Sequence, residues 1–370
     1  MAVPLLDLKA QYATIRDDVV GAMMDVVDNQ AFILGDPVAK LECDIAGLSQ
    51  TKYAVGCANG TDAILLALRA LGVGAGDEVV TTPFTFFATG GAVHNVGARP
   101  VFVDIDPRTF NIRPDAVAAA ITPRTKAVIA VDLFGQMAAI EQIAAAARGL
   151  PVIEDAAQSI GASRTIDGRK TMAGETATIG TFSFFPSKNL GGYGDGGMMV
   201  AQDEDVFERL MKLRTHGSRR TYYHEIVGYN SRLDALQAAV LLAKLPHLEG
   251  WSAGRRHNAA YYDAAFEGID AITVPYVEPE NTSIFNQYTI RVADRDGLKA
   301  HLTSRGIGSS VYYPLPLHLQ PCFAYLGYQE GQCPESERAA KEVLSLPIYP
   351  ELTTSQLDEV VGAVRSYYGR

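Results

Sequence analysis

The chain has 370 residues, which is long enough for one large core and a smaller lobe. Its formal net charge of -10 argues against a nucleic-acid partner, because polyanions are bound by basic surfaces. The 4 cysteines form no CxxC pair and do not cluster with the histidines, so we expect neither a metal site nor a disulfide framework.

The first residues, MAVPLLDLKAQY, carry Asp7 where a secretory signal would need an unbroken apolar core. No run of about 18 apolar residues follows, which is the length that a membrane-spanning helix requires. We therefore expect a cytoplasmic protein without a membrane partner.

Strand-like apolar runs alternate with helical patterns through the first half of the chain. The strand candidates are YAVGCA, DEVVTTP, PVFVDID, KAVIAVDLFG and PVIEDAAQ, and the helical patterns between them include TDAILLALRALG and AIEQIAAAARG. This alternation predicts an α/β protein with a mostly parallel sheet. The near-continuous apolar strands indicate helices on both faces, which makes a three-layer α/β/α large domain.

The second half begins with a helical pattern from about residue 232 to 266, broken near Pro246. It is followed by the strand QYTIRV, the helix GLKAHLTSRG, the strand SSVYYP and two terminal helices. These elements predict a smaller C-terminal α/β domain. We place the large domain at residues 1–254 and the small domain at residues 255–370.

A lysine at position 188 lies in the loop FFPSKNLGGYGDGG. Among small and apolar residues, its amine loses a proton more easily than a solvated amine and can trap a carbonyl group. Asp155 ends the strand PVIED, at the sheet edge where open α/β folds bind ligands. A carboxylate there can keep a pyridinium nitrogen protonated. Lys188 and Asp155 therefore predict pyridoxal 5'-phosphate as the cofactor.

Other residues could hold such a cofactor. Gly60 and Thr61 open a predicted helix, whose free amides suit a phosphate, although an ordinary helix cap is the alternative. Ser183 lies on a strand shortly before the lysine, so its hydroxyl could reach the same phosphate. Phe86, at a strand end, offers a flat surface for an aromatic ring.

Two nucleotide-binding patterns are missing. The glycines after the lysine do not follow the strand, GxGxxG and helix order of a dinucleotide site. The sequence also lacks GxxxxGK[ST], which removes a simple ATPase.

The sequence resembles the DegT/DnrJ/StrS family of nucleotide-sugar aminotransferases, which have the fold-type I pyridoxal-phosphate architecture. The resemblance extends over essentially the whole chain. It is carried by LGDPVAKLE, CANGTDAILLAL, GDEVVTTPFTFFAT, PVFVDIDPRTFNI, VIEDAAQSIGA, FSFFPSKNLGGYGDGGMM, YNSRLDALQAA and YYPLPLHLQP.

The resemblance implies a role for each matching residue of the cofactor site. Lys188 would form a Schiff base with the cofactor, and Asp155 would pair with the pyridine nitrogen. Gln158 would approach the ring hydroxyl, and Phe86 would stack on the ring. The phosphate contacts would come from Gly60, Thr61 and Ser183.

Family members are homodimers with shared active sites, which the resemblance extends to this chain. Asn230 would then reach the phosphate bound in the neighbouring subunit, and Arg232 would lie near the sugar there. The candidate substrate-binding side chains are Arg219, Arg232, Tyr312, Tyr313 and His318. A solvated loop is the alternative for Arg219 and its neighbour Arg220.

The implied reaction moves an amino group from L-glutamate to the keto carbon of a nucleotide-diphosphate sugar, for amino-sugar and polysaccharide biosynthesis. The segment YNSRLDALQAA resembles the branch that acts on 3-keto sugars, either UDP-linked uronates or dTDP-linked 6-deoxyhexoses. Tyr312 and Tyr313 stand where uronate enzymes carry a histidine and a tyrosine, which leaves the sugar open.

Three alternatives remain. The first is a 4-keto-sugar aminotransferase, and the second is a non-catalytic regulatory protein that binds cofactor or sugar. The third is an amino-acid aminotransferase or lyase on the same fold, which would use Arg291 or Arg305 for the substrate carboxylate.

Overall fold

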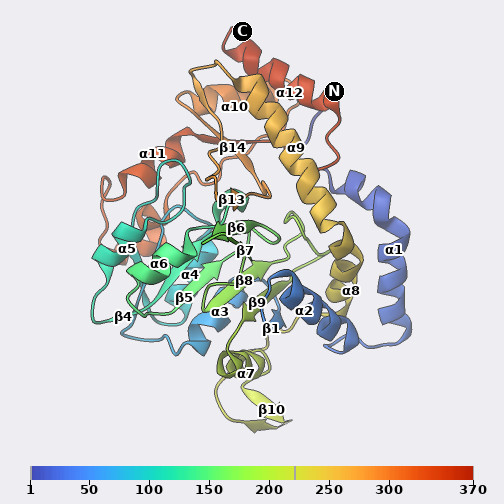
Figure 1. The fold of residues 1–370 in the computed structure, drawn as a ribbon, viewed down its shortest axis with the longest axis vertical. Coiled ribbons are helices and arrows are strands. Elements are labelled where there is room, and N and C mark those ends of the chain that lie inside the picture. The colour runs from blue at the N-terminus through green and yellow to red at the C-terminus, as the bar shows by residue number, and fades with distance from the viewer. Residues whose placement is uncertain (1, 221, 370) are drawn as a thin grey trace.

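The computed structural model describes residues 2–220 and 222–369, and a seven-stranded sheet forms its centre (Figure 1). In spatial order the strands are β1 (Tyr53–Cys57), β9 (Gly197–Ala201), β8 (Ile179–Ser183), β5 (Val152–Asp155), β4 (Thr125–Val131), β2 (Glu78–Thr81) and β3 (Arg99–Phe102). The strands from β8 to β3 pair in parallel, whereas β9 is antiparallel to both of its neighbours.

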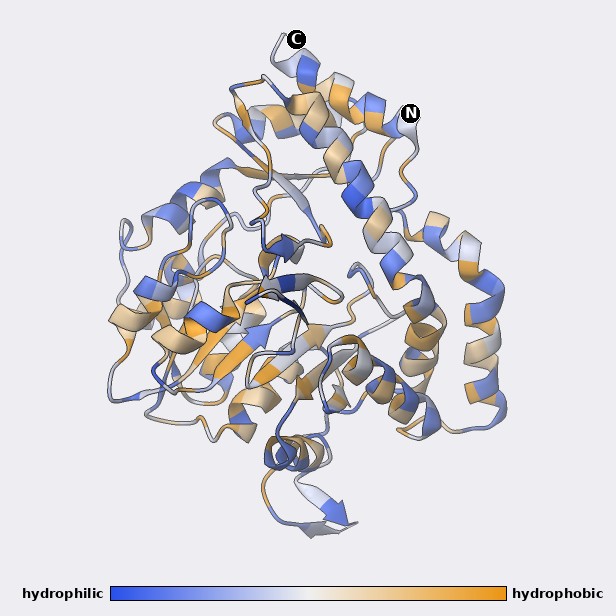
Figure 2. Ribbon diagram, in the orientation of Figure 1, coloured by the Kyte–Doolittle hydropathy of each residue, from blue (hydrophilic) through white to orange (hydrophobic). Residues whose placement is uncertain are grey.

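Helices cover both faces of this sheet, as the apolar strands predict. One face packs on α3 (Gly60–Ala70), α4 (Phe87–Asn95) and α7 (Glu204–Leu213). The other face packs on α2 (Asp36–Leu48), α5 (Pro114–Ala120), α6 (Ile140–Ala146) and α8 (Ala235–Lys244). Figure 2 shows the central strands largely in orange, the colour of apolar residues. The predicted three-layer α/β/α arrangement is confirmed.

The smaller lobe contains an antiparallel sheet in the order β12 (Ile272–Thr273), β14 (Tyr288–Val292) and β15 (Val343–Leu346). Its core includes residues of α9 (Leu248–Phe266), α10 (Arg295–Ser304) and α12 (Thr354–Tyr367). Helix α11 (Pro334–Glu342) packs in a separate core that contains Val131 of β4 and Val343 of β15. The remaining helix, α1 (Leu8–Asp28), packs outside α8 through Ile15 and Val19.

Two short ribbons complete the described strands. One is the three-stranded sheet β13 (Asn281–Thr282), β6 (Ser163–Ile166) and β7 (Arg169–Met172). The other pairs β10 (Ser218–Arg220) with β11 (Tyr223–His224), and we call these two strands the hairpin. The hairpin projects from the body at the end opposite the small lobe (Figure 1).

The predicted strand SSVYYP is wrong. In this stretch Ser310 forms one bridge with Ser345, and the chain then leaves the small sheet toward Pro314. Proline has no amide hydrogen to continue a ladder, so a regular strand is not maintained there. The departure carries Tyr312 and Tyr313 away from the small sheet.

Helix α9 joins the two lobes. It follows α8 after a 3₁₀ turn at Leu245–His247 that contains Pro246, where the sequence predicts a break. Leu248 packs in a core beside the large sheet, and Phe266 packs in the core of the small lobe. The predicted boundary between residues 254 and 255 falls inside α9, so this division stays a prediction.

In the part of the chain that the structure describes, no helix combines the length and apolar character needed to cross a bilayer.

Candidate active site

A cavity of about 610 Å³ lies where β5 and β8 end, at the carboxyl edge of the parallel strands. Open α/β sheets bind their ligands at this edge. The structure brings 9 of the predicted site residues together here, namely Gly60, Thr61, Phe86, Asp155, Gln158, Ser183, Lys188, Tyr312 and Tyr313.

The N-terminus of α3 forms a narrow cradle in one wall. Asn59 caps the helix, since its Oδ1 accepts a hydrogen bond from the Asp62 amide at 2.9 Å. A Cβ atom at Gly60 would lie only 2.7 Å from Cβ of Ser183, so this close approach requires glycine. Free amides, the Ser183 hydroxyl and Thr61 thus meet at a helix end, which suits a phosphate.

Asp155 is the last residue of β5, and the residue is only 5% exposed. Thr89 Oγ1 donates a hydrogen bond to Asp155 Oδ2 at 2.8 Å, and the Oγ1 atoms of Thr85 and Thr89 lie 3.0 Å apart. Burial raises the pKa of Asp155, while the bond from Thr89 and the charge of Lys188 act in the opposite direction. Sequence reasoning missed Thr89, although the spacing of Thr85 and Thr89 in PFTFFAT is that of one helix face.

Gln158 is held by two hydrogen bonds that fix the orientation of its amide. Its Oε1 accepts from the Phe134 backbone N–H at 2.7 Å, and its Nε2 donates to the Tyr313 hydroxyl at 3.2 Å. Because a backbone N–H can only donate, the amide oxygen must face Phe134. The amide nitrogen therefore faces Tyr313, beside the cavity.

Lys188 lies in a tight loop after β8. Its backbone N–H donates to the Phe185 carbonyl at 2.8 Å, and a Cβ at Gly191 would lie 2.4 Å from the Pro186 carbonyl oxygen. The surrounding protein desolvates the amine and lowers the pKa of Lys188 to about 8, although Asp155 opposes this shift. A fraction of the amine is then unprotonated and nucleophilic at neutral pH.

The sequence match now decides the family. Residues 13–365 match the DegT/DnrJ/EryC1/StrS aminotransferase family. This chain belongs to that family. It is a pyridoxal-phosphate-dependent transaminase with the fold-type I architecture.

Individual relatives cover the chain almost completely. A "pleiotropic regulatory protein" of Geobacillus stearothermophilus is 53% identical over 100% of this chain and 99% of its own length. The UDP-N-acetyl-3-dehydro-alpha-D-glucosamine 3-aminotransferase of Acidithiobacillus ferrooxidans is 46% identical over 98% and 97%. The crystal structure of S. venezuelae DesV with a ketimine intermediate has a TM-score of 0.97 and 41% identity, covering 100% and 99% of the two chains.

The cavity of this family member fits pyridoxal phosphate. The cradle at Gly60 suits the phosphate, Asp155 suits a protonated ring nitrogen, and the amine of Lys188 suits the aldehyde. Phe86 is 59% exposed and lines the cavity, so its ring is available for stacking. When bound, the cofactor supplies an electron sink for the electrons of a broken C–H bond.

Four predicted site residues of this aminotransferase do not line the cavity of their own chain, and three of them lie in or beyond the hairpin. Arg219 lies in the hairpin and forms an ion pair with Glu208 at 3.1 Å. Asn230 is exposed, and Arg232 is half-buried. Both lie on the segment that leads from the hairpin to α8.

His318 is corrected to a packing residue. Its side chain is fully buried, and its Nε2 lies 3.0 Å from Oε1 of Glu337. It lies in the 3₁₀ turn Leu317–Leu319 and does not line the cavity, so the structure does not support its predicted contact with the substrate.

The arginines that an amino-acid aminotransferase would use also lie elsewhere. Arg291 forms an ion pair with Glu342 at 2.7 Å, and Arg305 follows the end of α10. Among the described residues that line the cavity, Lys188 is the only cationic side chain.

Proposed function

We propose that this chain transfers the amino group of L-glutamate to the C3 keto carbon of a nucleotide-diphosphate sugar. The observation that carries the proposal is the meeting of Lys188, Asp155 and Gln158 in one cavity whose wall contributes no arginine. Both halves of a transamination need these three groups, and the acceptor is inferred from the named relatives. The name of the relative with 46% identity supports a 3-keto sugar on UDP.

Each residue of the cavity receives a role in this proposal. Gly60, Thr61 and Ser183 bind the cofactor phosphate, and Phe86 stacks on the ring. Asp155 keeps the ring nitrogen protonated, and the amide N–H of Gln158 donates to the ring oxygen. Lys188 would hold the aldehyde and, once free, its amine would take a proton from the amino-bearing carbon of L-glutamate in the first half-reaction and deliver one to the keto carbon of the sugar in the second.

The enzyme would act as a homodimer with shared sites. Tyr222 and Val227, beside the hairpin, are 89% and 84% exposed, and large apolar side chains gathered on a surface mark an interface. A partner that covers them would receive Asn230 near its phosphate site. Arg219, Arg232, Tyr312 and Tyr313 would then contact the nucleotide sugar. The location in the cytoplasm stays a prediction.

A non-catalytic regulator is the second candidate, because the relative with 53% identity is named as a regulatory protein. The intact set of Lys188, Asp155 and Gln158 supports the enzyme instead, since a protein that only binds the cofactor has no need of a proton carrier. A 4-keto sugar remains the alternative acceptor.

The test follows the two halves of the reaction by absorbance. The purified holoenzyme is first converted to its aminated form with L-glutamate, and then 3-keto and 4-keto sugars on UDP and dTDP are added. We expect the original spectrum to return only with a 3-keto sugar. Return with a 4-keto sugar would move the chain to that branch, and failure of every amino donor would favour the regulator.

A further inference from the structure

The segment Ser283–Gln287 connects β13 to β14 and places two amide side chains, Asn286 and Gln287, in the wall of the cavity. It comes from the small-lobe side of the site, whereas Asp155 and Ser183 belong to the large sheet. The approach to this segment and the segment itself are held by separate sets of contacts.

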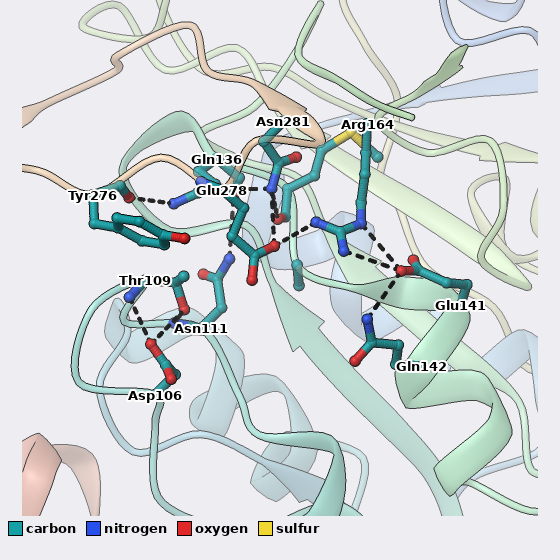
Figure 3. A network of polar contacts seen from close by, with 12 residues as sticks. Asp106, Thr109, Asn111, Gln136, Glu141, Gln142, Arg164, Tyr276, Glu278 and Asn281 are labelled. Atoms are coloured by element: carbon teal, nitrogen blue, oxygen red, sulfur yellow. Dashed lines mark hydrogen bonds and ion pairs between the residues drawn. The ribbon is translucent and has the colours of Figure 1, made fainter. Parts of the chain in front are cut away.

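A polar network fixes the chain just before this segment (Figure 3). Gln136 donates to the Tyr276 carbonyl at 2.9 Å, and its Oε1 accepts from the Glu278 amide at 2.7 Å. The buried guanidinium of Arg164 forms ion pairs with Glu141 and with Glu278. The start of the connection therefore has little freedom to move.

Further hydrogen bonds hold the segment itself. The Gly135 carbonyl accepts from the Ile284 amide at 3.0 Å, and a Cβ atom at Gly135 would lie 2.8 Å from the Asn286 nitrogen. The side chain of Asn189, next to the lysine of the site, donates to the Ile284 carbonyl at 3.0 Å. Arg255 donates to the Phe285 carbonyl at 3.1 Å. The backbone that carries Asn286 is thus tied to both lobes.

The amide oxygens of the side chains on this backbone lack hydrogen-bond partners among the described residues. Asn286 is only 8% exposed, and its Oδ1 is buried without a hydrogen-bond partner among the described residues. Oε1 of Gln287 is in the same state. An unpaired buried acceptor is costly, so two of them in one ligand cavity indicate that a ligand group, or water in its place, completes them.

The chemistry of an amide selects the ligand group. A carboxylate only accepts hydrogen bonds, so it cannot satisfy an unpaired amide oxygen. A hydroxyl both donates and accepts, as does a carboxamide, so the two groups match in either orientation of the amide. We propose that Asn286 and Gln287 bind hydroxyl groups of the sugar ring. This inference rests on the proposed function.

The test compares a sugar nucleotide with the bare nucleotide. Affinities of the holoenzyme for UDP-N-acetylglucosamine and for UDP are measured by calorimetry in the wild type, in Asn286→Ala and in Gln287→Met. We expect each variant to bind the sugar nucleotide about threefold to tenfold more weakly, the effect of one lost hydrogen bond, with UDP unchanged.

Thr282→Ala is the matched control, because Thr282 is exposed on the same connection and does not line the cavity. Unchanged affinity for the sugar nucleotide in both variants would overturn the inference, as would an equal loss for UDP, which indicates a general disturbance. If the wild type binds neither ligand, and neither dTDP nor dTDP-glucose, the proposed function itself fails. These two failures are therefore distinguishable.

Discussion

The cavity and the hairpin differ in how they hold their site residues. In the cavity, Asp155 and Gln158 are buried and fixed by hydrogen bonds within the chain. Beyond the hairpin, Asn230 is exposed, and Arg232 has no hydrogen-bond or ion-pair partner in the described chain. The cavity residues are therefore fixed within one chain, whereas the side chains beyond the hairpin are available to contact another molecule.

The difference separates chemistry from assembly. One chain supplies the amine, the carboxyl and the phosphate cradle, so proton transfer and most cofactor contacts depend on intrachain geometry. Recognition of the sugar would in addition depend on a second copy. Variants in the two regions should therefore fail in different ways.

Lys188→Ala should cause the largest loss. It removes the proton carrier and the amine that traps the aldehyde, so turnover should fall by about 100- to 10,000-fold. The rate of spectral change with L-glutamate measures this loss. Lys188→Arg is the matched control, because it keeps the charge but cannot trap a carbonyl, and an active Lys188→Arg enzyme would contradict the assigned role.

Asp155→Asn should lower turnover by about 100- to 1,000-fold, since a neutral amide no longer stabilises a positive ring nitrogen. The variant should still bind and colour with the cofactor, because the phosphate cradle and Lys188 are intact. Steady-state kinetics and an absorbance spectrum separate the two effects. Full activity would show that the ring nitrogen needs no carboxylate.

Mixing inactive subunits tests the comparison directly. Lys188→Ala and Arg232→Ala should each be inactive, but half of the randomly mixed dimers contain one intact site. The mixture should then recover about one quarter of wild-type activity if the sites are shared across a two-fold dimer. A mixture of Lys188→Ala with Asp155→Asn is the control, and it should recover nothing. Equal behaviour of both mixtures would argue against shared sites.

Thr89→Val should have a moderate effect, because it removes the hydrogen bond that stabilises ionised Asp155. Loss of this bond raises the pKa of Asp155, so the acid limb of the pH–rate profile should move upward by about one unit. Thr85→Val is the control, since Thr85 bonds to Thr89 but has no direct bond to Asp155. An unchanged acid limb in Thr89→Val would assign that limb to another group.

Glu154→Gln should spare activity and change stability. Burial and the neighbouring Asp132 raise the pKa of Glu154 well above 4.5, so the folded chain keeps a proton that the unfolded chain releases as the pH rises. Wild-type stability therefore falls with increasing pH, whereas glutamine has no proton to lose. In urea unfolding at about pH 5 and 8, the free energy of unfolding of the variant should exceed that of the wild type by about 1–3 kcal/mol. This gain should be larger at pH 8. A gain independent of pH would contradict this account.

Much of the cavity could be predicted from the sequence, because its residues follow strand ends. Asp155 and Ser183 terminate β5 and β8, and parallel strands bring their carboxyl ends to one edge. Asn286 and Gln287 could not be predicted in this way, since they reach the site through long-range contacts with Gly135 and Arg255. His318 was misplaced because its motif does not reveal that Glu337, on α11, binds it from inside the protein.

Helix α9 also limits how the molecule can move. It has 19 residues, about 28 Å of continuous helix, and is embedded at each end in a different core. Such an element acts as a rigid strut, because bending it would break hydrogen bonds within its turns. The small lobe therefore does not rotate freely about a hinge at residues 254 and 255. Opening and closing of the active site should instead come from loops such as the exposed tip at Phe185.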